Sequence, residues 1–331
     1  MNIMEQDSRV VLLPAIADLQ LTDSLKRYFE KGGRTILLGE ERTEYVDRRM
    51  NPVRIAGESE AAFKQFADDL RTRVGKSLIA LDQEPAGILR LHKLVPKMPS
   101  LEDFNSMSDN AIERICREIA IAARGIGVSM FLSPIVDVVS GQNIWLRNRT
   151  LGIDPVEVAR IASACTRGFE GGGILATAKH FPGHHDIDAD PALAIAEVSG
   201  PASAFEPGFA PFKAVIEAGV GAIMLGPAFA PSIDPTEPSS TSKATVDLLR
   251  GRFKFNGLVV SDDLDSPATM RGRSLEETAI ASLNAGVDLM LVAAGDHIED
   301  LSKAIQTAVE NGKLKEERLA DAATRVRSLL V

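Results

Sequence analysis

Short apolar runs alternate along the chain with longer segments whose apolar residues recur at the spacing of an amphipathic helix. The apolar runs cover residues 10–14, 34–38, 77–81, 128–135, 173–178, 221–225, 257–260 and 287–292. The helix-like segments between them include residues 61–74, 109–126, 155–170, 211–218, 243–253 and 275–285. Continuous apolar runs are typical of parallel strands that are buried on both faces. The pattern therefore predicts an α/β fold of about eight strand–helix units, the number that closes a (β/α)8 TIM barrel.

Residues at the ends of these segments support the predicted helices. Asp154 followed by Pro155 is typical of an N-cap and a first helical position, and Ser274 and Glu277 have the spacing of a capping box. Residues 313–331 predict one extra helix at the C-terminus, outside the barrel. Because no low-complexity segment or long linker interrupts the pattern, we expect residues 1–331 to form a single domain.

Composition and charge narrow the class of protein. The net charge of −9 argues against nucleic acid as a partner, because binding to phosphate backbones needs a basic surface. The sequence has no apolar stretch long enough to cross a membrane and no N-terminal signal pattern. Its two cysteines, Cys116 and Cys165, both fall in helix-like segments, so we expect reduced thiols and a cytoplasmic protein. No feature of the sequence indicates an oligomeric state.

Ionisable residues follow several of the predicted strands. In a parallel barrel the carboxyl ends of the strands meet at one rim, where active sites are found. The residues expected at that rim are Asp82, Glu84 and Arg90 after the third run, Asp137 and Arg149 after the fourth, Lys179 and His180 after the fifth, and Asp262 and Asp263 after the seventh. Carboxylates and guanidinium groups hold neighbouring hydroxyls through charge-assisted hydrogen bonds. The rim therefore predicts a site for a small, hydroxyl-rich ligand such as a carbohydrate.

Five segments along the chain carry a resemblance to a known family. They are residues 80–84, 148–155, 238–243 and 260–264, together with the string Lys-His-Phe-Pro-Gly-His at residues 179–184, which is the most specific of the five. With these segments in this order, the chain resembles the family 3 glycoside hydrolases. Within that family it is similar to the single-domain β-N-acetylglucosaminidases that recycle bacterial cell-wall muropeptides.

The resemblance implies a role for each matching residue. Asp262 would be the catalytic nucleophile of a retaining enzyme, forming a covalent glycosyl-enzyme. The residues implied to bind the sugar ring are Asp82, Arg90, Arg149, Lys179 and His180. No metal ion or other cofactor is implied. From the residues alone, Asp262 or Asp263 could instead be the N-cap of a helix that follows the strand.

One departure from the family concerns the general acid/base. The resembled enzymes carry an Asp-Ser-His triplet after the histidine string, and its histidine transfers the proton, but here the triplet is Asp190-Pro191-Ala192. A histidine expected near the sixth strand is likewise Pro227. Because an acid/base on a loop can shift by a few residues, we expect His185 or Asp188 to take the vacant role.

Two further interpretations of this loop remain open. Its histidines and aspartates are of the types that bind a divalent cation, although no second cluster of partners accompanies them. The aspartates also suit an ordinary solvated loop.

Three functions are therefore compatible with the sequence. The first is a retaining glycosidase that acts on a β-linked N-acetylhexosaminide with an altered acid/base. The second is a diverged relative that performs phosphorolysis or transfer, or that cleaves only activated glycosides, which need no acid. The third is a non-catalytic sugar-binding protein. Retention of Asp262 favours an enzyme, because a binding protein does not need a nucleophile.

Overall fold

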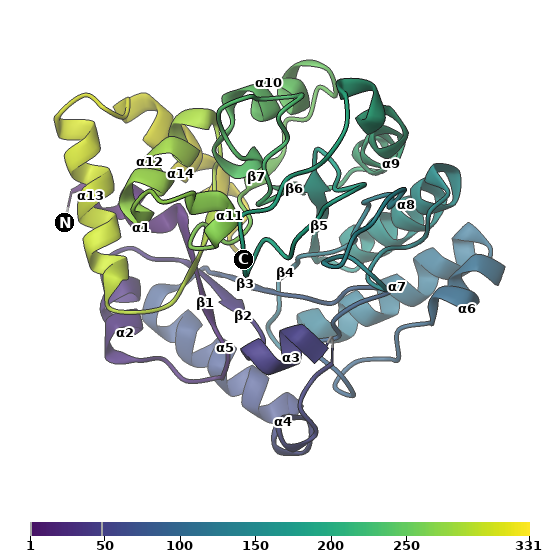
Figure 1. The fold of residues 1–331 in the computed structure, drawn as a ribbon. Coiled ribbons are helices and arrows are strands. Elements are labelled where there is room, and N and C mark those ends of the chain that lie inside the picture. The colour runs from purple at the N-terminus through teal and green to yellow at the C-terminus, as the bar shows by residue number, and fades with distance from the viewer. Residues whose placement is uncertain (1, 48) are drawn as a thin grey trace.

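The computed structural model describes residues 2–47 and 49–331, which form eight parallel strands surrounded by helices (Figure 1). The strands are β1 (Leu12–Ile16), β2 (Thr35–Leu38), β3 (Leu78–Leu81), β4 (Met130–Phe131), β5 (Leu175–Phe181), β6 (Ala222–Leu225), β7 (Leu258–Val260) and β8 (Met290–Ala293). They pair in the order β7-β6-β5-β4-β3-β2-β1-β8. A parallel bridge between Val260 and Leu289 joins the two ends of this order. Each strand overlaps one of the eight apolar runs, so the predicted (β/α)8 barrel is confirmed.

Helices occupy the connections between the strands. The α-helices are α1 (Ile3–Val10), α2 (Asp23–Glu30), α3 (Arg42–Asp47), α4 (Pro52–Gly57), α5 (Glu60–Val74), α6 (Leu101–Ser106), α7 (Asp109–Gly125), α8 (Pro155–Gly171), α9 (Glu206–Glu217), α10 (Lys243–Gly251), α11 (Pro267–Met270), α12 (Leu275–Ala285), α13 (His297–Glu310) and α14 (Glu316–Ser328). Two short 3-10 helices cover Ala202–Phe205 and Ser239–Thr241. Helix α14 is the predicted extra C-terminal helix, and it packs against α1 with an ion pair between Arg327 and Asp7. Among the described residues, no helix has the length and apolar character needed to span a membrane.

Helix α9 begins at Glu206, whereas the sequence pattern predicted a start at Pro211. Proline favours the first turn of a helix, and here that position belongs to Pro207, so Pro211 lies inside the helix. The earlier start places Phe209 among aromatic rings, where it stacks on Phe205 at 6.2 Å between ring centroids. Apolar packing thus stabilises a turn that the helix signals alone did not indicate.

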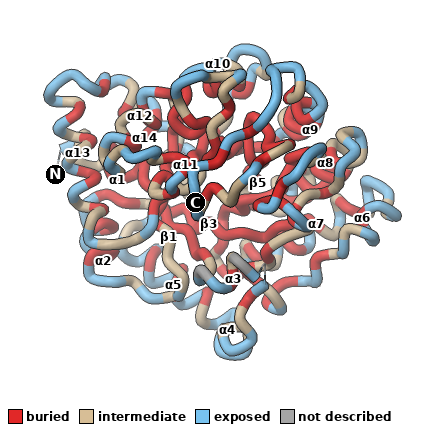
Figure 2. Tube along the Cα trace, in the orientation of Figure 1, coloured by how far each residue is buried: buried red, intermediate tan, exposed pale blue. Residues whose placement is uncertain are grey.

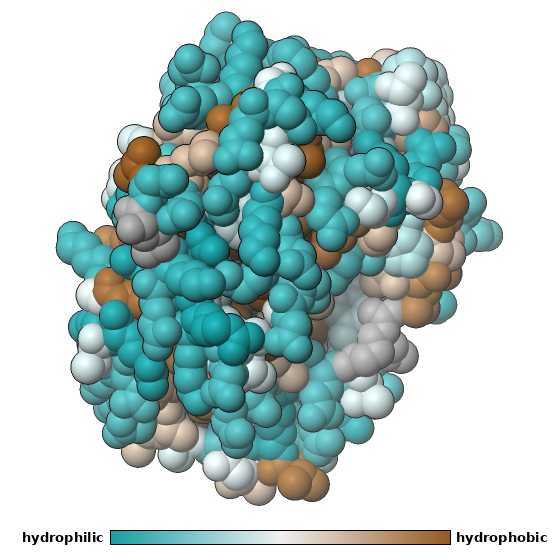
Figure 3. Space-filling view, turned by 90° about the vertical axis from the view of Figure 1, so that its left-hand side faces the viewer, coloured by the Kyte–Doolittle hydropathy of each residue, from teal (hydrophilic) through white to brown (hydrophobic). Residues whose placement is uncertain are grey.

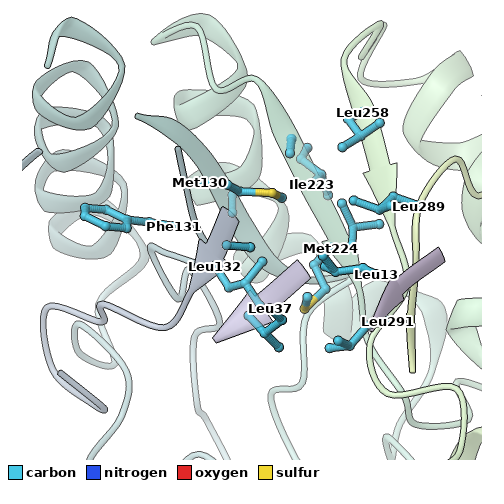
Figure 4. Close-up of a cluster of buried hydrophobic side chains, with 14 of the residues drawn as sticks. Leu13, Leu37, Met130, Phe131, Leu132, Ile223, Met224, Leu258, Leu289 and Leu291 are labelled. Carbon is cyan, nitrogen blue, oxygen red and sulfur yellow. The ribbon is translucent and has the colours of Figure 1, made fainter. Parts of the chain in front are cut away.

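The barrel interior is filled by apolar side chains (Figure 4). The labelled residues that come from the strands or from positions next to them are Leu13, Leu37, Met130, Leu132, Ile223, Met224, Leu258, Leu289 and Leu291, and all are buried. Phe131 points the other way and packs edge-on against Phe169 of α8, at 5.2 Å between centroids. This alternation along β4 is what a strand buried on both faces requires.

Exposure follows the same layering. Buried segments lie in the middle of the molecule and exposed segments follow its periphery (Figure 2). On the face shown in Figure 3, hydrophilic side chains predominate and hydrophobic ones are scattered between them. Because the interior of the barrel is packed, a ligand can reach the barrel only at its ends.

Candidate active site

A cavity of about 460 Å³ opens at the carboxyl ends of the strands. Its acidic and basic lining residues are Glu40 after β2, Asp82 after β3, Arg149 after β4, Lys179 and His180 on β5, and Asp262, Asp263 and Asp265 after β7. Five of the predicted site residues therefore line one cavity, as expected for residues at or after the carboxyl ends of the strands: Asp82, Arg149, Lys179, His180 and Asp262.

A buried network of charges occupies the side of the cavity formed by β3, β4 and β5. The ammonium Nζ of Lys179 donates to Asp82 Oδ1 at 2.6 Å and lies 2.8 Å from Glu84 Oε1. Arg149 donates to both carboxylate oxygens of Glu84, at 2.6 Å and 3.2 Å. Burial opposes ionisation of Glu84, but Arg149 and Lys179 outweigh it and hold the pKa of this carboxyl far below its usual range. Glu84 is therefore ionised and held by two cations before any ligand binds.

Arg149 keeps one donor for a ligand. Its Nη1 is buried and has no hydrogen-bond acceptor among the described residues. The guanidinium also lies over the rings of Tyr45 and Trp145, at 5.7 Å and 5.8 Å from their centroids. Because a buried N–H without an acceptor costs free energy, a ligand hydroxyl or carbonyl at this point would be stabilised.

His180 links the network to the predicted nucleophile. Its Nδ1 lies 2.8 Å from Asp137 Oδ2, and its Nε2 lies 3.7 Å from Asp262 Oδ2. Burial lowers the pKa of His180 even though Asp137 acts in the opposite direction, so the imidazole is neutral at neutral pH. With a carboxylate accepting at Nδ1, the proton of the neutral ring sits on Nδ1, and Nε2 is left as an acceptor facing the cavity.

Asp262 lies at the rim of the barrel rather than against the outer helices. Its backbone N–H donates to Ser240 Oγ at 3.2 Å, and its Oδ1 accepts from the backbone N–H of Asp263 at 2.8 Å. The helix that follows, α11, has Ser266 as its N-cap. Neither Asp262 nor Asp263 therefore serves as that cap, and the helix-cap interpretation is wrong.

Three predicted site residues do not line the cavity. Arg90 is fully buried, and its guanidinium donates to Glu58 through two hydrogen bonds of 2.7 Å and to the carbonyl of Gly39 at 2.9 Å. His185 packs its ring edge-on against Phe205, and its Nε2 lies 2.9 Å from the carbonyl oxygen of Ser199. Asp188 is exposed, with its Oδ1 3.4 Å from the backbone N–H of Glu197.

Ala192, by contrast, faces the cavity together with Pro191. The turn that carries them is held by Asp190, whose Oδ1 accepts from the backbone N–H of Ala192 at 3.0 Å. Further along, the backbones of Ala196 and Val198 pair with Phe229 after β6. The loop is thus tied to the neighbouring loop, and position 192 faces the cavity.

Glu40 and Asp265 are cavity residues that the sequence analysis missed. Glu40 Oε1 is buried without a hydrogen-bond partner among the described residues. Burial, reinforced by Asp82 and Glu84, raises the pKa of Glu40 well above its usual range. Both residues follow apolar runs, at 34–38 and 257–260. Their position after predicted strands was therefore the sequence signal that places them at the active rim of the barrel.

No metal centre is formed by the loop after β5. Within residues 2–47 and 49–331, no group of three or more histidine, cysteine, aspartate or glutamate residues is arranged to hold a metal ion. His185 and Asp188 instead contact separate backbone groups, at Ser199 and Glu197.

Comparisons with known proteins identify the family of the chain. The sequence profile of the glycosyl hydrolase family 3 N-terminal domain matches residues 50–329. A β-hexosaminidase of Nitrosomonas eutropha is 29% identical over 253 residues, which are 73% of each chain. One from Xylella fastidiosa is 31% identical over 237 residues, which are 69% of this chain and 70% of the relative.

Solved structures extend the match to nearly the whole fold. A family 3 β-N-acetylglucosaminidase of Paenibacillus sp. superposes with a TM-score of 0.88 at 25% identity, over 99% of this chain and 62% of that longer chain. A β-N-acetylhexosaminidase of Beutenbergia cavernae shares the fold at 22% identity, with a TM-score of 0.84 over 99% of this chain and 98% of the other. With the profile match covering most of its length, the chain belongs to glycosyl hydrolase family 3.

Proposed function

We propose that this protein is a retaining glycosidase that hydrolyses β-linked N-acetylhexosaminides, with Asp262 as its nucleophile. The observation that carries the proposal is the position of Asp262, whose carboxylate shares one cavity with Arg149, Lys179 and His180. The names of the relatives, β-hexosaminidase and β-N-acetylglucosaminidase, support the substrate class.

In this mechanism the charged side of the cavity holds the sugar ring. Lys179 and Asp82 offer a paired donor and acceptor to neighbouring hydroxyls, and Arg149 offers its unpaired Nη1. His180 would accept a hydrogen bond from a sugar hydroxyl at Nε2, because its Nδ1 is engaged by Asp137. These contacts would orient the anomeric carbon toward Asp262.

Asp262 would then attack the anomeric carbon with Oδ2, the oxygen nearer to His180. Its other oxygen stays hydrogen-bonded to the backbone N–H of Asp263, which restricts rotation of the carboxylate. The bond to the leaving group breaks, a glycosyl ester forms, and water cleaves the ester in a second displacement. Two moderate barriers replace one high barrier.

A second candidate function is cleavage or transfer restricted to activated glycosides. The observation in its favour is the apolar character of the loops expected to face the leaving group, where Pro191, Ala192 and Pro227 line the cavity. A good leaving group departs without a proton, so such an enzyme needs no acid on these loops.

The first test is substitution of the nucleophile. We expect Asp262→Ala to lower kcat for 4-nitrophenyl N-acetyl-β-glucosaminide by at least about 10⁴-fold. Asp247→Ala, an exposed substitution on α10, is the control and should leave kcat unchanged. Mass spectrometry after incubation with a slowly hydrolysed 5-fluoro analogue should find a glycosyl adduct on the peptide that contains Asp262.

Normal turnover by Asp262→Ala would refute the nucleophile assignment. Comparing hydrolysis of the nitrophenyl substrate with that of an unactivated disaccharide then separates the two candidate functions. Product formation that depends on added phosphate would indicate phosphorolysis instead.

A further inference from the structure

The carboxyl group of Asp263 has no assigned role, although it lines the cavity directly beside Asp262. Among the described residues, no side-chain or backbone group forms a hydrogen bond or ion pair with this carboxyl. Only its backbone is engaged, with the N–H donating to Asp262 Oδ1 at 2.8 Å. A carboxyl group in a cavity without a protein partner is available to a ligand.

The groups that face Asp263 are mainly acidic. Asp262 and Asp265 approach from its own segment, Asp82 from the end of β3, and Lys179 from β5 is the one cation of this set. Burial, and then the negative charges of these three aspartates, raise the pKa of Asp263 well above its usual range. The surroundings of Asp263 therefore favour its protonated form, next to the carboxylate proposed as nucleophile.

We propose that Asp263 is the general acid/base of this enzyme, in place of the missing loop histidine; the inference rests on the proposed function of Asp262. In the first step Asp262 Oδ2 bonds to the anomeric carbon. The electron pair of the broken glycosidic bond goes to the leaving oxygen, which takes the proton of Asp263. In the second step a water oxygen bonds to the anomeric carbon, the ester electron pair returns to Asp262, and the water proton passes to Asp263.

The charge of Asp262 changes during the reaction and shifts the protonation equilibrium of Asp263 with it. While Asp262 is an anion, it favours the protonated form of Asp263, which suits an acid. Once Asp262 is esterified, that negative charge is gone, and Asp263 ionises more readily, which suits a base. Pairs of carboxyl groups with opposite protonation states are the common arrangement in retaining glycosidases.

Glu40 is the other cavity carboxyl whose pKa is raised well above its usual range. After burial, the charges that act most strongly on Glu40 are those of Asp82 and Glu84, which belong to the sugar-holding network. Those acting most strongly on Asp263 begin with Asp262. Asp82 acts on both carboxyls, but Asp262 is a neighbour of Asp263 and is not among the charges that act most strongly on Glu40. Proximity to the nucleophile therefore assigns the proton transfer to Asp263.

The test compares leaving groups in Asp263→Asn, which keeps the shape of the side chain and removes the transferable proton. We expect kcat/KM for an N-acetylglucosamine disaccharide to fall by about 10²- to 10⁴-fold. For the 4-nitrophenyl glycoside, the first step should change by less than about tenfold, because a phenolate leaves without a proton. The basic limb of the wild-type pH profile should disappear, and azide should accelerate turnover of the nitrophenyl substrate and yield a glycosyl azide.

Control variants separate this role from a structural one. Asp247→Asn, an exposed substitution of the same chemistry, should keep the wild-type profile. His185→Gln and Asp188→Asn test the loop residues in the same assays. Circular dichroism of each variant verifies folding, and azide rescue distinguishes a lost proton donor from a damaged cavity.

Several results would overturn the inference. They are normal disaccharide hydrolysis by Asp263→Asn, loss of the basic limb in His185→Gln or Asp188→Asn instead, or a wild-type enzyme that cleaves activated substrates alone. If Asp262→Ala is inactive while Asp263→Asn is normal, the inference fails and the proposed function stands. If Asp262→Ala is as active as the wild type, the proposed function itself fails.

Discussion

The two sides of the cavity are built from opposite kinds of residue. On the side of β3, β4 and β5, the charges of Asp82, Glu84, Arg149 and Lys179 form one buried network. On the side of the loops after β5 and β6, the lining residues are Pro191, Ala192 and Pro227, none of which can ionise. The difference separates two tasks: the charged side has fixed donors and acceptors that can hold a sugar, whereas the apolar side supplies no proton, so the proton for the leaving group is proposed to come from Asp263.

The charged side also carries a free-energy cost. Removing charged groups from water is expensive, and the mutual attraction of these four side chains offsets that cost only while the set is complete. Such a network is therefore better explained by ligand binding than by stability. The lining residues of the apolar side, Pro191, Ala192 and Pro227, form no ion pairs, so substitutions there leave no unpaired charge.

The largest effect is expected from breaking the network. Glu84→Gln removes the carboxylate that both Arg149 and Lys179 contact. Loss of one partner of a buried ion pair typically costs about 3–5 kcal/mol. Urea denaturation at pH 7 should therefore find a free energy of unfolding lower by about that amount. Glu217→Gln, which breaks an exposed pair with Lys213 on α9, is the control and should cost less than about 1 kcal/mol.

The difference in unfolding free energy between the wild type and Glu84→Gln should depend on pH. Because the pKa of Glu84 is lower in the folded protein than in the unfolded chain, its stabilisation is present above pH of about 4 and is lost as the pH falls. The difference between the wild type and Glu84→Gln should therefore shrink on acidification. A difference that stays constant between pH 7 and pH 3 would contradict the ionised network.

A smaller effect is expected from adding a proton donor to the apolar side. Ala192→His places an imidazole at a position that already faces the cavity, with Asp190 two residues away. We expect kcat/KM for a disaccharide to rise by about tenfold, well short of the full range of general acid catalysis, because nothing else in the loop has adapted to the new ring. Ala194→His, an exposed substitution on the same loop, is the control.

No gain from Ala192→His would indicate that the loop as a whole has diverged and not one side chain. A gain confined to the nitrophenyl substrate would argue against proton donation, since that leaving group does not need it. Both outcomes are read from initial rates on the two substrates.

The sequence was sufficient for the barrel because apolar runs and helix signals are local. The same strand-end reasoning brought Asp82, Arg149, Lys179 and Asp262 together, since the register of parallel strands aligns their carboxyl ends. Arg90 was not predictable in this way. It lies on a loop, and its direction is set by Glu58, a partner that is distant in the sequence.

The loop after β5 shows a second limit. His185 has the chemistry of an acid/base, but its orientation depends on Ser199 and Phe205, which come later in the chain. A sequence states which side chains a loop carries, whereas tertiary packing decides which of them point inward. Glu40 is the opposite case, because its place after β2 is local information that predicts a cavity residue.

The smallest effect is expected from loosening the apolar side. Asp190→Ala removes the hydrogen bond from Ala192 N–H to the Asp190 carboxylate, which is partly exposed to water. Because water can replace that partner, the free energy of unfolding should fall by about 1 kcal/mol, well below the loss expected for Glu84→Gln. Asp188→Ala on the same loop loses only a contact of 3.4 Å and should cost less. If urea denaturation finds the same loss of unfolding free energy for Asp190→Ala and Glu84→Gln, the loop contributes as much to stability as the charged network. The contrast between the two sides would then not hold.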